Sequence, residues 1–387
     1  MATKPTTEKK ATNPLDSVHP IHSVSHTIGC DPEFFFKRGN RIIGSELVFP
    51  KGTTKTEGYF PKAVPETYGA VGKFIVDGVQ AELNPQAQGC RAFMCNNIAH
   101  SFKALKQDIL DKNKDISICF DRSVIISKTE LNKLDPNNQV FGCTPSFSAY
   151  PPSEKQLQID TVDAREYRVR AAGGHIHLGH TQIPKMDDHR ELVMLLDIIV
   201  GNTCVLIDRD KGNRERRKLY GRAGEYRLPP YGIEYRTLSN FCLHSSQLTS
   251  LVFGLCRLAL SVYFGTNKEC VKAFLEACPI EDIQKAINTN SYLLALKNYN
   301  KLEPLIAKAL GSYSHETYAI SSPQLYQFRY FFETVKDKGL EYFFPEDPLT
   351  HWVNFKEGHD KGAGFYSWAM NDLKNKYDAD KQKISPQ

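Results

Sequence analysis

The sequence predicts an α+β fold, in which a mainly antiparallel sheet has helices packed on one face and is followed by a helical C-terminal part. Two observations lead to this prediction. Strand-like segments gather in residues 26–242, whereas residues 243–345 have mostly helical patterns. The strict alternation of strands and helices that marks a parallel sheet is missing.

The first half of the chain contains most of the expected strands. SHTIGCDPEFFFKRG (25–39) predicts a strand, and a turn at 38–40 leads into a second strand, RIIGS, which completes a hairpin. KFIVDGVQAELNP (73–85) predicts a strand with a turn at Asp77-Gly78. The apolar spacing of residues 90–113 predicts a helix, and residues 116–126 have strand character again. GCxPxF occurs at both 29–34 and 142–147, as a weak internal echo.

The second half begins with AAGGHIHLGH (171–180), which predicts a strand. Residues 187–210 predict a helix with its N-cap at Asp187 or Asp188. We then expect a basic loop over residues 211–230, a further strand over 231–241, and mostly helix over 245–340. The predicted organisation begins with a disordered tail over residues 1–25. One domain with a sheet-rich and a helix-rich half follows over 26–345, and a polar extension over 346–387.

Composition narrows the class of protein. Hydrophobic residues make up 41% and charged residues 24%, which is ordinary for a globular chain. A net charge of +5 over 387 residues does not predict nucleic-acid binding. The longest apolar run, 248–264, is interrupted by Arg257 and predicts a buried helix, not a membrane span. Ten cysteines without a CxxC pair, and a polar N-terminus, predict reduced thiols in a cytoplasm.

Four strand-like segments place polar residues two positions apart among small or apolar neighbours. In a strand, residues i and i+2 point to the same face. The pairs are Asp31 with Glu33, Gln80 with Glu82, His175 with His177, and Glu234 with Arg236. A solvated strand face explains one such pair. One sheet face lined by the carboxylates and imidazoles among them would be costly to desolvate without cations, and carboxylates with a few imidazoles favour Mg²⁺ or Mn²⁺.

Arginines supply the complementary charge. Six of them lie between residues 214 and 236: Arg214, Arg216, Arg217, Arg222, Arg227 and Arg236. Guanidinium groups match phosphate oxygens and often bind them in a bidentate way. For Arg214 and Arg216 a solvated charge run is the favoured interpretation. Cations held by carboxylates beside an arginine-rich segment predict a site that handles polyphosphate.

These residues also carry a family resemblance. In chain order, GxDPEFF, QAELNP, GGHIHLG, RxxYGxAGEYR and GIEYRTLSN resemble the amidoligases of tailed phages and some bacteria, the carboxylate–amine ligases of the second type. The motif order is similar to that of glutamate–cysteine ligases and, more distantly, glutamine synthetase. The resemblance runs from Gly29 to Asn240 and is expected to include the helical part that follows. It implies a curved, glutamine-synthetase-like sheet and an amidoligase catalytic domain over residues 26–345.

The resemblance further implies a reaction and a set of roles. In such enzymes ATP phosphorylates a carboxylate to an acyl phosphate, and an amine then attacks to give an amide, ADP and phosphate. The implied metal ligands for Mg²⁺ or Mn²⁺ are Asp31, Glu33, Glu82 and Glu234. The implied catalytic residues are Arg236, Glu234 and His177. The implied groups for nucleotide phosphates or the substrate carboxylate are His175, Arg217, Arg222 and Arg227.

The expected partners are small-molecule or peptide carboxylates and amines, with no membrane and no nucleic acid. Oligomer formation and virion association stay open. Two other functions also stay open. One is a non-catalytic, virion-associated structural or binding protein that keeps the ligase fold. The other is a Zn²⁺-dependent hydrolase that uses His175, His177 and a carboxylate, which leaves the arginines unexplained.

Overall fold

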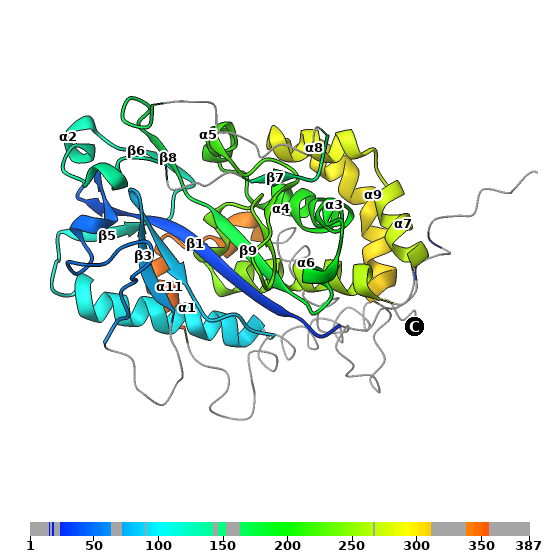
Figure 1. Cartoon of the computed structure of the whole chain (residues 1–387), viewed down its shortest axis with the longest axis horizontal. Coiled ribbons are helices and arrows are strands. Elements are labelled where there is room, and N and C mark those ends of the chain that lie inside the picture. Colours follow the sequence, from blue (N-terminus) through cyan, green and yellow to red (C-terminus); the bar gives the residue numbers. More distant parts are fainter. Residues whose placement is uncertain are drawn as a thin grey trace, which may run out of the picture.

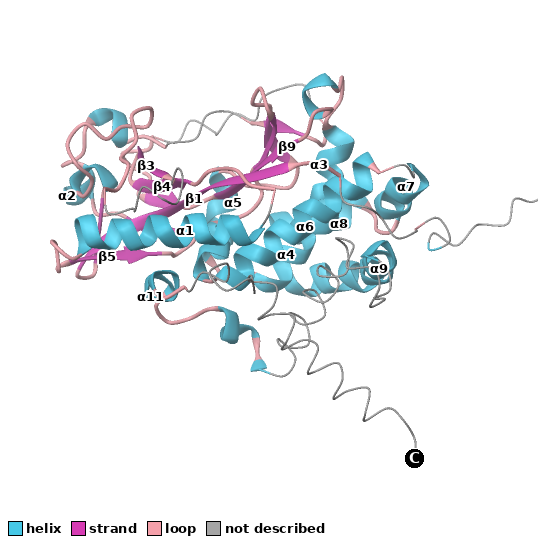
Figure 2. Ribbon diagram, turned by 90° about the horizontal axis from the view of Figure 1, so that it is seen from below, coloured by secondary structure: helices cyan, strands magenta, loops and turns pink. Residues whose placement is uncertain are grey.

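The computed structural model describes Leu15, Val18 and residues 24–62, 72–89, 91–141, 146–151, 163–265, 268–310 and 338–355. Over these residues the predicted α+β fold is confirmed. Nine strands form one sheet in which every pairing is antiparallel, and a separate two-stranded sheet lies beside it. Most helices of the described chain lie on one side of the main sheet (Figure 2). The likeness of this sheet to glutamine synthetase stays a prediction.

The long first strand organises the sheet. Along the sheet the order is β3 (Lys73–Asp77), β4 (Gln80–Asn84), β1 (Thr27–Arg38), β9 (Gly174–Gly179), β11 (Gly232–Tyr235), β10 (Glu225–Arg227) and β7 (Phe147–Ser148). The C-terminal half of β1 pairs with β2 (Arg41–Ile43) and β5 (Ile116–Cys119). The small sheet pairs β6 (Ser123–Ile125) with β8 (Val169–Ala171). Figure 1 shows β1 and β9 side by side across the molecule.

The helices follow in the chain between and after these strands. They are α1 (Arg91–Leu105), α2 (Lys128–Leu131), α3 (Arg190–Leu196), α4 (Asn202–Ile207), α5 (Gly212–Leu219), α6 (Ser246–Phe264), α7 (Lys268–Glu276), α8 (Ile280–Asn288), α9 (Tyr292–Leu310) and α11 (Pro348–Val353). A π-helical turn, η4 (Lys106–Leu110), extends α1, and another, η7 (Asp197–Gly201), joins α3 to α4. Short 3₁₀ segments are η2 (Ser45–Leu47), η5 (Pro136–Asn138), η6 (Ile183–Lys185), η8 (Asn240–His244) and η9 (Leu340–Phe343).

The core lies between the sheet and the helices. Four even-numbered residues of β1 belong to it: Ile28, Cys30, Phe34 and Phe36. Phe34 packs against four aromatic rings, those of Phe36, Phe74, Phe102 and Phe120. Helix α6 is long and apolar enough to span a membrane by composition, but 78% of its apolar window is buried in this core. The alternation of β1 therefore leaves its odd-numbered residues on the opposite face of the sheet.

Several predicted elements differ in detail. Residues 73–85 form a hairpin, β3–β4, in which Gly78 has φ 67° and begins the two-residue turn; glycine suits this position because its φ is positive. Residues 116–126 divide into β5 and β6. The basic loop predicted for 211–230 is wrong, because the segment contains α5 and β10. These elements form because α5 and β10 pack on β8 and β11, which local composition does not reveal.

The structure places the N-cap of α3 at His189, one residue after the predicted Asp188. The Asp188 side chain still accepts a hydrogen bond from the Arg190 amide at 2.9 Å, at the first residue of the helix. Most of the echo at 142–147 lies outside the described residues, as does most of the predicted tail 1–25. Val18 in that tail is buried in the core. Within the predicted polar extension, α11 carries the fully buried Trp352.

Candidate functional site

The strand register brings the four predicted polar pairs onto one face of the sheet. Asp31 lies opposite His175 in the β1–β9 ladder, and His177 lies opposite Glu234 in the β9–β11 ladder. On the other side of β1, Glu33 lies opposite Glu82. Directly paired residues of antiparallel strands share a face. This face is the one turned away from the core, so it presents carboxylates, imidazoles and arginines together.

Asp31, His175, His177 and Glu234 form the first group, which we call the histidine cluster. Asp31 lies 3.3 Å from Nδ1 of His175 and 3.0 Å from Nε2 of His177. Nδ1 of His175 is also 3.5 Å from Glu234. Burial alone would raise the pKa of Asp31, but the two imidazoles, His177 foremost, hold it well below the usual range. Burial disfavours the imidazolium of His177, yet Asp31 and then Glu234 outweigh this and raise its pKa.

Two arginines complete the histidine cluster at Glu234. Oε1 of this carboxylate lies 3.1 Å from Nε of Arg236 and 3.2 Å from a terminal nitrogen of Arg227. The Arg236 side chain is almost fully buried, donates to Ser146 Oγ at 2.6 Å and stacks on the Tyr220 ring. Side-chain exposure of Arg227 is 27%, so its charge stays closer to solvent. Glu234 thereby fixes two cations on the site face.

Glu33, Asp77 and Glu82 form the second group, which we call the carboxylate cluster. Each offers one oxygen, and these atoms lie within 4.8 Å of one another. The three residues are only 2%, 4% and 8% exposed. Burial raises the pKa of Glu82 well above its usual value, and Asp31, Asp77 and Glu33 raise it further. Lys55 forms an ion pair with Asp77. Oxygen donors gathered in this way suit a hard divalent cation.

Neutral donors hold the carboxylate cluster in position. Oε2 of Glu33 accepts hydrogen bonds from the Gly173 amide at 2.6 Å and the Tyr220 hydroxyl at 2.8 Å. Asn84 donates to Glu82 at 2.7 Å. A Cβ on Gly173 would lie 2.5 Å from Nε2 of His175, so only glycine leaves room for the imidazole there. Gly173 thus serves both clusters. Its neighbour Gly174 has a different reason, because a Cβ there would lie 2.3 Å from the backbone oxygen of Ser239.

The remaining arginines of the predicted site lie elsewhere. Arg217 donates to Asn290 at 2.8 Å, and burial lowers its pKa to about 10. Arg222 donates to the backbone carbonyl of Arg217. The structure thus does not bring these two into either cluster, and their predicted phosphate-binding role stays a prediction. Arg216 is fully buried and donates to three backbone carbonyls after β11, which excludes a solvated charge run at this position.

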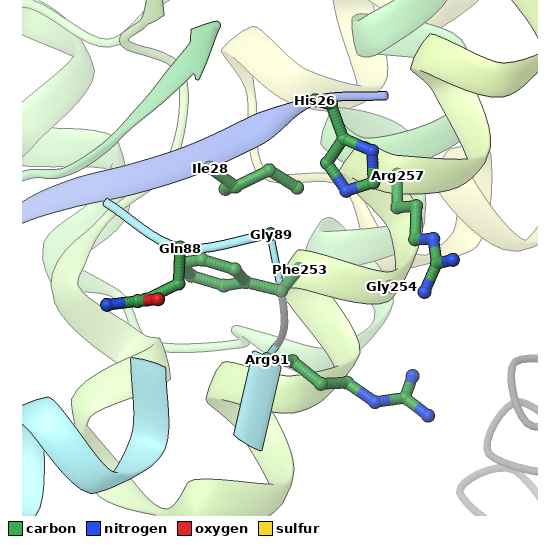
Figure 3. Close-up of a pocket in the computed structure, with 8 residues that line it drawn as sticks. All are labelled: His26, Ile28, Gln88, Gly89, Arg91, Phe253, Gly254 and Arg257. Atoms are coloured by element: carbon green, nitrogen blue, oxygen red, sulfur yellow. The ribbon is translucent and has the colours of Figure 1, made fainter. Parts of the chain in front are cut away.

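A small pocket lies on the other side of the sheet. Figure 3 shows it between the start of β1, the segment before α1, and α6. Its lining residues are His26, Ile28, Gln88, Gly89, Arg91, Phe253, Gly254 and Arg257. Ile28 is a core-side residue of β1, whereas Asp31 and Glu33 point to the opposite face. The pocket is therefore separate from both clusters.

Several site residues were not predicted from the sequence. Asp77, Lys55, Gly173, Tyr220 and Tyr231 all contact one of the clusters. The hydroxyl of Tyr231 bonds Nδ1 of His177. A predicted hairpin over residues 73–85 would place Asp77 at the site, because Asp77 then pairs directly with Gln80, which shares a face with Glu82. Tyr220 lies inside the RxxYGxAGEYR motif, but its hydroxyl had no assigned partner.

The site lies on one face of an antiparallel sheet and combines buried carboxylates, imidazoles and arginines. This combination is typical of proteins that bind a divalent cation beside an anionic group. Residues 158–309 match the family model described as phage phiEco32-like COOH.NH2 ligase-type 2. This match supports the amidoligase family predicted from the motifs and, in general terms, a carboxylate–amine ligase function. It includes His175, His177, Glu234 and Arg236, whereas Asp31, Glu33 and Glu82 precede it. No curated protein matches the chain.

Proposed function

We propose that this protein is an ATP-dependent carboxylate–amine ligase that forms an amide through an acyl phosphate. The observation that carries the proposal is the shared face on which the carboxylate cluster lies beside Glu234 and its two arginines. Phosphoryl transfer to a carboxylate brings several anionic groups together. Such a reaction needs neutralised charge and alignment more than a strong base.

The residues present fit a divalent cation. Three buried carboxylates lie within 4.8 Å of one another, and burial first, then repulsion from neighbouring carboxylates, raises the pKa of Glu82 and Glu33. Glu33, Asp77 and Glu82 would hold one Mg²⁺ or Mn²⁺, and Asp31, His175 and Glu234 form a second metal-type group. When bound, such cations neutralise phosphate oxygens and orient the γ-phosphoryl group. Five of these six possible ligands are carboxylates and one is an imidazole, a donor set that favours Mg²⁺ or Mn²⁺ over a two-histidine Zn²⁺ site.

The proposed reaction has two steps. A carboxylate oxygen attacks the γ-phosphorus of ATP, and the bond to the β–γ bridging oxygen breaks to release ADP. An amine nitrogen then attacks the acyl carbon, gives up one proton and displaces inorganic phosphate, which leaves the amide. Arg236 and Arg227, oriented by Glu234, would stabilise the charge on the moving phosphoryl group. His177, held by Asp31 and Tyr231, would contact the phosphates from the neighbouring strand, β9.

The substrates in this proposal are a small-molecule or peptide carboxylate and an amine. A cytoplasmic location is part of the proposal, and it is supported by the eight described cysteines, all of which are buried free thiols. Arg217 and Arg222 enter the proposal only through the family resemblance, because their contacts lie with Asn290 and backbone carbonyls.

Calorimetric titration of ATP tests the proposal. ATP is added in the presence of Mg²⁺ or of EDTA to wild type, Glu33→Ala and the surface control Glu166→Ala, whose carboxylate pairs with exposed Lys128. We expect Mg²⁺-dependent binding in wild type and the control, and its loss in Glu33→Ala. Release of ADP is then measured with panels of carboxylates and amines. No binding of ATP under any condition would contradict the proposal and favour the non-catalytic alternative.

A further inference from the structure

A lysine from a surface loop reaches the carboxylate cluster. Lys55 lies in the segment between Pro50 and Tyr59, and its ammonium pairs with Asp77. The lysine side chain is 54% exposed, whereas the Asp77 side chain is 6% exposed. Burial disfavours the ammonium, but Asp77, Glu82 and Glu33 outweigh this and raise the pKa of Lys55. The ammonium therefore contacts one carboxylate of a cluster whose three oxygens lie within 4.8 Å of one another.

The loop that carries Lys55 is a self-bonded turn. The Thr53 amide donates to Pro50 O at 3.1 Å, the Thr54 amide to Glu57 O at 2.8 Å, and the Glu57 amide to Thr54 Oγ1 at 2.9 Å. At its base, Tyr59 exchanges two backbone hydrogen bonds with Phe74 on β3. Most residues of the turn are exposed. The turn can therefore shift at its tip without breaking a strand ladder or opening the core.

The charges of the cluster and the lysine do not balance. Three buried carboxylates converge within 4.8 Å, and Lys55 supplies one positive charge at Asp77. A divalent cation brings twice that charge and bonds oxygens directly, at distances that an ammonium cannot approach. The ammonium and the cation both need the Asp77 carboxylate. Repulsion between them makes joint occupancy of the same oxygens unfavourable.

We propose that Lys55 is a tethered counter-ion of the carboxylate cluster that a divalent cation displaces when it binds Glu33, Asp77 and Glu82. In the metal-free protein the ammonium reduces repulsion among the carboxylates. On metal binding it leaves Asp77, and the turn at residues 51–57 moves with it. The inference rests on the proposed function, because it takes the cation to be the metal of the ligase site. It adds a competitor within the chain that lowers the metal affinity of that site.

Calorimetric titration with Mn²⁺ alone tests the competition. The variants are Lys55→Met and, as a matched control from the same turn, Lys51→Met, whose exposed side chain has no ion pair among the described contacts. Loss of the competing ion pair is expected to tighten Mn²⁺ binding about threefold to fivefold in Lys55→Met, the upper range for a half-exposed pair. Lys51→Met is expected to bind as wild type does.

Trypsin cleavage of the wild-type protein gives a second readout that needs no variant. Release of Lys55 from Asp77 should speed cleavage after Lys55 severalfold when Mn²⁺ is added, relative to cleavage after Lys51 in the same digest. If Lys55→Met binds Mn²⁺ with the same affinity as wild type, or if the cleavage ratio does not change with Mn²⁺, the inference is overturned. Neither result would contradict the proposed function. Failure of wild type to bind Mn²⁺ at all would count against both proposals.

Discussion

The two clusters lie on the same face of one sheet, yet their charges are compensated differently. In the histidine cluster, the chain supplies the cations: Glu234 contacts Arg227 and Arg236, and Asp31 contacts two imidazoles. In the carboxylate cluster, three buried carboxylates face one half-exposed lysine. The pKa of Asp31 is held low, whereas the pKa of Glu82 is raised well above its usual value.

The difference in charge compensation indicates a different role for each cluster. A carboxylate already paired with buried arginines holds those arginines in a fixed geometry, because breaking a buried pair leaves an uncompensated charge. A group of carboxylates that lacks matching cations gains free energy when a cation arrives. We infer that the histidine cluster orients charge toward phosphates, and that the carboxylate cluster is the part of the site that recruits metal.

Glu234→Gln tests the first half of this comparison and should have the largest effect. The amide keeps the shape of the side chain but loses the charge that holds Arg227 and Arg236. We expect ATP turnover to fall by about 100- to 1000-fold, the range seen when one preorganised transition-state contact is lost. ADP release in the presence of Mg²⁺ measures this, and circular dichroism checks that the fold is kept. Wild-type turnover in this variant would remove Glu234 from the machinery.

Asp197 offers a third way to accommodate a buried carboxylate. It lies on the core side and accepts hydrogen bonds from the hydroxyls of Tyr150 and Tyr235 at 2.7 and 2.6 Å. Burial raises its pKa from 3.8 to about 7, and the hydrogen bonds only partly oppose this. Between these two values the folded protein keeps a proton that the unfolded chain has lost. Stability should therefore fall as pH rises across this window and be level above it.

Asp197→Asn should flatten that pH dependence. The change between wild type and variant is expected to be roughly 2–4 kcal/mol in free energy of unfolding across the window. Urea unfolding at a series of pH values between 4 and 8 measures it, with EDTA present so that metal binding does not contribute. Parallel curves for the two proteins would show that Asp197 is ionised throughout. That result would weaken the inference that uncompensated burial also raises the pKa of Glu82.

These cases show how far sequence reasoning extends here. The period of two along a strand correctly placed Asp31 with Glu33 and His175 with His177, because that alternation is a local property. Which strands lie side by side is set by tertiary packing, so the opposition of Glu33 and Glu82 was not derivable from spacing. The motif order of a known family supplied that link instead.

The missed residues have individual causes. The turn in 73–85 was placed one residue early, at Asp77-Gly78, and this moved Asp77 from the site face into a turn. Lys55 lies in a loop without periodicity, where no pattern marks a function. Arg216 was read as an exposed charge, but its guanidinium is buried by carbonyls of residues 236–238, about twenty positions along the chain. Contacts at such separation leave no local signal.

Glu82→Gln tests whether the carboxylate cluster lacks matching cations. Removing one of three mutually repelling carboxylates should stabilise the metal-free protein by about 1 kcal/mol at pH 8, a rise of about 1–2 °C in Tm for a chain of 387 residues. The same change should weaken Mn²⁺ binding at least about tenfold, because a ligand is lost. Differential scanning fluorimetry in EDTA and calorimetry with Mn²⁺ measure the two effects.

The matched control for Glu82→Gln is Glu130→Gln. Glu130 is also buried, but it pairs with Arg41 and Lys133. Loss of its charge should lower Tm, opposite in sign to the effect at Glu82. A fall in Tm for both variants would show that the carboxylate cluster is as well compensated as the pairs elsewhere, and the contrast between the two clusters would then not hold.

Tyr231→Phe should have the smallest effect and tests how rigid the histidine cluster is. The Tyr231 hydroxyl bonds Nδ1 of His177, while Nε2 of the same ring faces Asp31. Removing the hydroxyl leaves the ring held at one nitrogen, so we expect kcat to fall only about twofold to tenfold, with little change in Tm because Tyr231 is 51% exposed. The ¹⁵N chemical shifts of His177 report the altered contact directly. An unchanged kcat together with shifted resonances would mean that Asp31 alone orients His177, and the fixed geometry would then reside in the ion pairs of the cluster.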